Sequence, residues 1–180
     1  MKKGFTLIEL MVVIVIVVII TVTSIVGISA SRSRRQVKTT AENLESFLTE
    51  ARAEATSPDD TSFGVAKLRL EISTSGVRLY KVNASNSNLG EMSSPKFSIP
   101  GGISVTANGS MTHLTTGCFS ANPCDYFSFN TSSSSTLSIG QITNTNPAAA
   151  ASIGIRVSNG NDSYQVTDDV LTGLITITQL

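Results

Sequence analysis

An apolar run from Leu7 to Ile20 limits most strongly what this chain can fold into, and only Glu9 interrupts it. An ionisable side chain within a membrane-length segment costs several kcal/mol unless it finds a partner. A secretory signal peptide would place its small-residue cleavage site after the apolar run. Here Gly4 comes before the run instead. Cleavage after Gly4 would therefore leave the hydrophobic segment in the mature chain as a retained anchor.

The length of 180 residues suits one modest domain plus an anchor. From Val37 onward the chain has eight basic and twelve acidic residues. Because general affinity for nucleic acid depends mainly on neutralising phosphates, this mildly acidic part makes nucleic acid an unlikely partner.

The first third of the chain predicts one long helix with two different surfaces. At about 1.5 Å per residue, residues 5–30 are long and apolar enough to cross a bilayer. Residues 31–57 predict an amphipathic continuation, which ends where a proline at position 58 pushes the preceding residue out of the α region. Its apolar stripe consists of Val37, Ala41, Leu44, Leu48, Ala51 and Ala55. A basic segment at residues 32–38 would place the rest of the chain in the cytoplasm by the positive-inside rule.

Residues 58–180 predict a β-rich head. Alternating residues at 67–72 and 77–82, with a polar turn between them, indicate an antiparallel hairpin. Its predicted inner face consists of Leu68, Leu70, Ile72, Val77 and Leu79. Further strands are predicted at 97–99, 103–105, 126–129, 136–142, 153–157, 164–167 and 174–177. The predicted fold class is α+β: a long N-terminal helix, transmembrane and then amphipathic, packed on an antiparallel β-sheet head.

Cys118 and Cys124 are the only cysteines, and five residues separate them. In an exported chain the simplest interpretation is one disulfide that closes a short loop, and the alternative is two free thiols. Together with the single histidine, His113, they fall short of the four ligands of a structural zinc site.

Residues 4–13, Gly-Phe-Thr-Leu-Ile-Glu-Leu-Met-Val-Val, resemble the class III signal of type IV pilins and pseudopilins at every position. The resemblance implies that a prepilin peptidase removes the leader, residues 1–4, by cutting between Gly4 and Phe5. It also implies methylation of the new amino group on Phe5. In this family the glutamate at the position of Glu9 meets the positively charged amino terminus of a neighbouring subunit, which would compensate its charge. Many pilins carry a proline in the second half of the anchor, where this chain has Gly27.

The resemblance implies a structural role. The sequence has no Gly-x-Ser-x-Gly motif and no phosphate-binding glycine loop, so we expect no enzymatic activity. The chain would be a subunit of a type IV pilus or a type II secretion pseudopilus, polymerised through its N-terminal helix. Its partners would be other subunits, the peptidase, the membrane and the inner-membrane assembly platform. The head would lie outside the inner membrane despite the basic segment, and later in a periplasmic or extracellular filament. Residues 47–55 are weakly similar to the helix end of H-type pseudopilins and minor pilins.

Two further groups of residues allow other interpretations. Asp162, Asp168 and Asp169 could supply oxygen ligands for calcium, the only candidate cofactor, although turn chemistry explains the same residues. Lys67, Arg69, Arg78 and Lys81 lie on the first hairpin and could contact the phosphates of DNA. The alternative function is therefore a tip-located minor pilin that binds DNA in natural transformation. The simpler interpretation is that these four side chains form the solvent-exposed face of an amphipathic hairpin.

Overall fold

The computed structural model describes residues 6–56, 65–73, 76–93, 96–108, 111–130, 142–143, 152–169 and 172–180. The side chains of residues 22–30 and 142–143 are not among those described. Gly4, Phe5, the predicted helix stop at residues 57–58 and most of the predicted strand at 136–142 therefore lie outside the described residues. The chain forms two compact units, residues 1–36 and residues 37–180.

Helix α1 runs from Leu7 to Ala55 and passes through both units. In the second unit its predicted apolar stripe is confirmed, because all six side chains from Val37 to Ala55 have no exposed surface. The opposite face is polar, and Lys38 and Glu42 form an exposed ion pair there, with Nζ 3.6 Å from Oε1. This spacing of four residues places the two charges on one helical face, where such a pair contributes a few tenths of a kcal/mol at most.

The first sheet contains β3, β2, β1, β6 and β5 in spatial order, and β7 also pairs with β6. These strands are β1 (Lys67–Ser73), β2 (Gly76–Val82), β3 (Asn88–Glu91), β5 (Thr112–Leu114), β6 (Cys124–Asn130) and β7 (Ile142–Thr143). The predicted hairpin is confirmed: β1 and β2 pair antiparallel, with Leu70 opposite Leu79 and Ile72 opposite Val77. Gly76 begins β2 with a φ of 115°, a conformation that favours glycine.

The second sheet contains β10, β9, β8 and β4 in spatial order. These strands are β4 (Ser104–Ala107), β8 (Ser152–Ser158), β9 (Ser163–Asp169) and β10 (Ile175–Gln179). The head therefore has two antiparallel sheets, where the sequence led us to expect one. The strand predicted at residues 97–99 is wrong, because these residues are irregular, and the strands β3 and β5 were not predicted.

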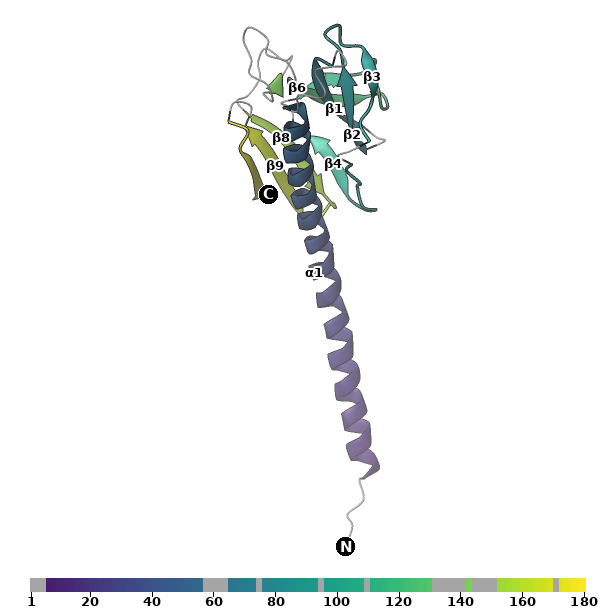
Figure 1. The fold of residues 1–180 in the computed structure, drawn as a ribbon. Helices are drawn as coiled ribbons and strands as arrows, with labels where there is room; N and C mark the ends of the chain where they lie inside the picture. The colour runs from purple at the N-terminus through teal and green to yellow at the C-terminus, as the bar shows by residue number, and fades with distance from the viewer. Residues whose placement is uncertain are drawn as a thin grey trace. The chain divides into compact units, whose positions relative to one another are not determined.

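One hydrophobic core joins residues 37–55 of α1 to both sheets, and Figure 1 shows this part of the helix lying along them. The largest fully buried side chains include Leu44 and Leu48 from the helix, Phe127 and Phe129 from β6, and Ile155 from β8. Full burial of one such side chain stabilises the fold by about 1.5–3 kcal/mol. The expected α+β fold, a helix packed on antiparallel sheets, is confirmed.

Candidate functional site

The first turn of α1 holds Glu9 in a capping box. Thr6 precedes the helix, and Glu9 follows three residues later, which is the Ser/Thr-x-x-Glu spacing of this motif. The Glu9 carboxylate accepts hydrogen bonds from Thr6 N at 2.9 Å and from Thr6 Oγ1 at 2.8 Å. In return, Glu9 N donates to Thr6 Oγ1 at 3.3 Å. Within one molecule, the carboxylate therefore caps its own helix through donors that carry no charge.

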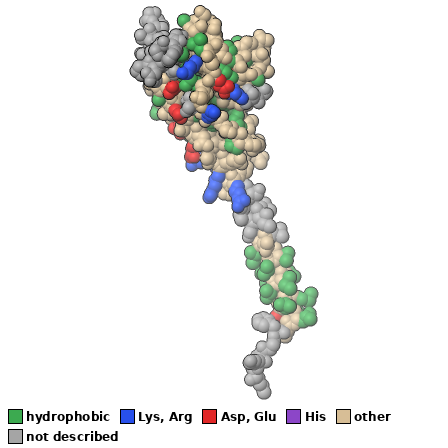
Figure 2. Space-filling view, turned by 45° about the vertical axis from the view of Figure 1, so that its right-hand side comes forward, with side chains coloured by type: hydrophobic (Ala, Val, Ile, Leu, Met, Phe, Trp, Pro, Cys, Tyr) green, Lys and Arg blue, Asp and Glu red, His purple; other side chains and the backbone are tan. Residues whose placement is uncertain are grey.

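The helix after this cap is apolar on every side. Large hydrophobic side chains from Leu7 to Ile20 are each at least half exposed in the single chain, from 50% at Ile16 to 78% at Leu7. Figure 2 shows hydrophobic side chains gathered along this stretch. An exposed apolar surface that encircles a helix needs cover from another apolar phase or another protein.

Among the described residues, no helix combines the length and apolar character needed to cross a membrane. The prediction of a transmembrane segment at residues 5–30 is not confirmed.

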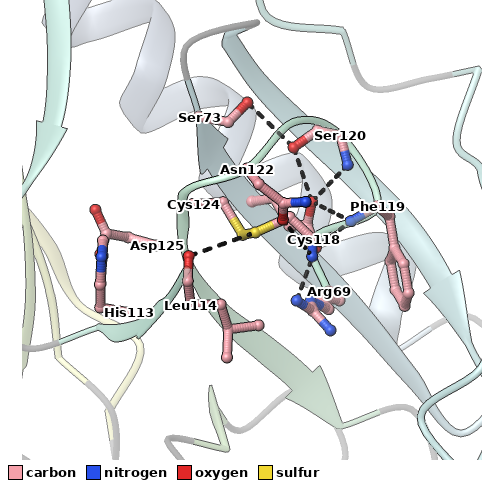
Figure 3. Close-up of a disulfide and its surroundings, with 11 residues drawn as sticks. Arg69, Ser73, His113, Leu114, Cys118, Phe119, Ser120, Asn122, Cys124 and Asp125 are labelled. Atoms are coloured by element: carbon pink, nitrogen blue, oxygen red, sulfur yellow. Dashed lines mark hydrogen bonds and ion pairs between the residues drawn. A yellow bond between two sulfur atoms is a disulfide. The ribbon is translucent and has the colours of Figure 1, made fainter. Parts of the chain in front are cut away.

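The predicted disulfide between Cys118 and Cys124 is confirmed. Figure 3 shows this disulfide, which closes the loop between the two cysteines, next to the first sheet. On the neighbouring strands β5 and β6, His113 and Asp125 lie opposite each other, with Nδ1 2.8 Å from Oδ1. Sequence reasoning missed this pair because their contact depends on the pairing of two strands.

The four basic residues of the first hairpin do not all lie on the solvent face that the sequence suggested, because Arg69 is buried. Arg69 is only 7% exposed, and its Nη2 lies 2.8 Å from Oε1 of Glu71. Arg78 binds Glu91 with Nη1 2.8 Å from one carboxylate oxygen and 2.9 Å from the other. Lys67 and Lys81 are half-buried. The outer face of β1 is covered by the disulfide loop, so alternation along this strand does not separate core from solvent.

The three aspartates considered for calcium have separate structural roles. Asp168 is buried on β9, and its Oδ1 lies 2.6 Å from Nη2 of Arg52 on α1. Burial raises the pKa of Asp168, and the positive charge of Arg52 opposes this effect. Asp169 accepts hydrogen bonds from the backbone and hydroxyl of Thr172 in a turn. The backbone N of Asp162 donates a hydrogen bond to Oδ1 of Asn159 at 2.8 Å, in a turn.

Among the described residues, no group of three or more histidines, cysteines or acidic residues is arranged to hold a metal ion.

A sequence model of the prokaryotic N-terminal methylation motif matches residues 1–28. No curated protein and no solved structure matches this chain. The matched segment contains both members of the capping box and the beginning of the apolar helix. Residues 1–28 are therefore the class III prepilin signal of type IV pilins and pseudopilins.

Proposed function

We propose that this chain is a prepilin that polymerises as a structural subunit of a type IV pilus or a type II secretion pseudopilus. The observation that carries this proposal is the methylation motif at residues 1–28. The leader, residues 1–4, is removed between Gly4 and Phe5, and Phe5 is then methylated. Residues 5–30 hold the subunit in the inner membrane and later in the filament. Residues 31–57 continue the helix into the head, residues 58–180.

The capping box supplies a physical account of assembly. Within the described part of one subunit, the Glu9 carboxylate accepts hydrogen bonds from the neutral donors of Thr6. In a bundle of apolar helices, a carboxylate without a counter-charge is costly. The amino group of Phe5 on a neighbouring subunit supplies that charge, so each added subunit removes the cost for the previous one. The assembly platform of the inner membrane would bring the two groups together.

The apolar surface from Leu7 to Ile20 supports the same proposal. Helices that are apolar on all sides pack in the interior of an assembly or in a bilayer. The subunit buries its head core without using these side chains, because the core begins at Val37. The apolar stretch is thus available for contact with lipid before assembly and with other helices afterwards.

The test is the intact mass and amino-terminal sequence of the protein recovered from native membranes and from sheared surface filaments. We expect a mature chain that begins at methylated Phe5 in the filament fraction. A Gly4→Val variant should remain uncut, since the resemblance places glycine at the cleaved bond. A wild-type chain that stays uncut and confined to membranes would contradict the proposal.

A further inference from the structure

Glu71 is a fully buried carboxylate on the outer face of the first sheet, and the proposed filament role does not use it. It lies in the middle of β1, opposite Arg78 on β2 and Tyr126 on β6. Burial of a charge is unfavourable unless other groups hydrogen-bond to it or neutralise it. The partners of Glu71 therefore indicate what this position does.

Most of these partners belong to the disulfide loop, residues 118–124. Phe119 N donates to both carboxylate oxygens, at 3.1 and 3.0 Å. Ser120 donates to Oε2 twice, from its backbone N at 2.9 Å and from its Oγ at 2.8 Å. Two successive amides that point at one anion form a small anion-binding cradle. Hydrogen bonds to an ionised acceptor are stronger than bonds between neutral groups.

The ring of Phe119 is held at the same place. The guanidinium of Arg69, which pairs with Glu71, lies 4.5 Å from the centroid of the Phe119 ring and 3.8 Å from that of Tyr126. The ring of Tyr80 packs edge-on against that of Phe119, with 5.5 Å between the two centroids. Contacts that involve neither sulfur atom thus fix Phe119 and Ser120 to β1 and its neighbours.

The positions of the two cysteines follow from these contacts and from the pairing of β6 with its neighbours. Cys118 immediately precedes Phe119, so it is fixed by the contacts of Phe119 and Ser120. Cys124 begins β6, where it lies opposite Ser73 of β1 and Leu114 of β5. The side chain of Asn122 also binds the loop internally, since its Oδ1 accepts from Cys118 N at 3.0 Å. Figure 3 shows both cysteines beside this network.

We propose that Glu71 holds the disulfide loop against β1 and thereby positions Cys118 to form the disulfide with Cys124. In this step the two thiols lose two protons and two electrons and form one S–S bond. A disulfide oxidant, such as oxidised glutathione, accepts them and becomes two thiols. The two thiols are close enough to react when the loop is bound to Glu71, so Glu71 favours disulfide formation. The loop also remains bound to Glu71 when the disulfide is reduced.

The first test is a redox equilibrium. The full chain in detergent is equilibrated with mixtures of reduced and oxidised glutathione, its free thiols are alkylated, and the oxidised fraction is measured by mass. Glu71→Gln should lower the equilibrium constant for disulfide formation by about tenfold, because glutamine cannot bind both amides as a charged acceptor. The control is Thr115→Ala, a change at an exposed position just before the loop, which should match the wild type. An unchanged equilibrium constant in a folded Glu71→Gln variant would overturn the proposal.

Loss of a buried carboxylate beside Arg69 could unfold the chain, so a second measurement leaves Glu71 intact. In the Cys118→Ser/Cys124→Ser variant, the amides of Phe119 and Ser120 should still exchange slowly with deuterium. The amide of exposed Gly117 provides the internal reference for fast exchange. Exchange of all three amides at similar rates would mean that the disulfide alone holds the loop, and the proposal would then be wrong.

Discussion

Replacing Glu9 with glutamine should leave the chain trimmed after Gly4 but absent from filaments. Glutamine can still accept the hydrogen bonds of Thr6, so the start of the helix is retained. It carries no charge, however, and cannot neutralise the amino group of a neighbouring subunit in an apolar bundle. Immunoblots of membrane and sheared-filament fractions, with mass spectrometry of the amino terminus, measure both steps.

Thr6→Val is the matched variant for this prediction. It removes the hydroxyl that contacts Glu9 and keeps the carboxylate and the backbone hydrogen bond from Thr6 N. Loss of such a cap costs about 1 kcal/mol of helix stability. Filaments should therefore still form from Thr6→Val subunits. Loss of filaments in Thr6→Val would mean that assembly depends on the helix cap, and normal filaments from Glu9→Gln subunits would show that the assembly contact is wrong.

Replacing Arg52 with methionine should lower the free energy of unfolding by about 3 kcal/mol, because it leaves the buried Asp168 carboxylate without its cation. Arg52 also lies over the ring of Phe129, 5.8 Å from its centroid, so one side chain ties the helix to both sheets. Urea denaturation of the full chain in detergent, followed by circular dichroism, measures the loss.

The loss should depend on pH in a defined direction. Burial raises the pKa of Asp168, and removing Arg52 leaves that effect unopposed. A carboxyl group whose pKa is raised in the folded state favours folding at low pH, and this advantage disappears as pH rises through the folded pKa. The deficit of Arg52→Met should therefore be largest at neutral pH and shrink on acidification.

Two further variants identify the cause of this loss. Lys38→Met breaks the exposed pair with Glu42, whose side chains are 59% and 50% exposed, and should cost less than about 1 kcal/mol. The double variant Arg52→Met/Asp168→Leu removes both buried charges and should regain most of the lost stability. A double variant as unstable as the single one would show that packing of the Arg52 stem, and not the charge, matters.

The parts of the fold that the sequence predicted are those with a local signal. The helix stripe from Val37 to Ala55 repeats at spacings of three and four residues, and the first strand of the hairpin, residues 67–72, alternates polar and apolar residues. The strands β3 and β5 have four and three residues, too few for a period to appear. The division into two sheets depends on which strands pair, and this is not encoded within any one strand.

The candidate site shows the same limit. The capping box could have been found, because Thr6 and Glu9 stand at the spacing that defines it. The hydrogen bonds that hold the disulfide loop could not have been found, since Glu71 is 48 and 49 residues away from Phe119 and Ser120 in the sequence. Arg69 was therefore expected in solvent, because nothing near it in the sequence indicates a covering loop.

The lengths of the strands affect whether the heads of a protein that we propose to polymerise can also associate edge to edge through their sheets. The strands β1, β2, β6, β8 and β9, each with neighbours on both sides, all have seven residues. The described strands at the borders of the two sheets, β3, β4, β5, β7 and β10, have two to five. Short borders offer little template for strand addition from another molecule, and β3 adds a register shift and the charge of Glu91. The heads are thus protected against amyloid-like stacking even at the high local concentration that a filament would impose.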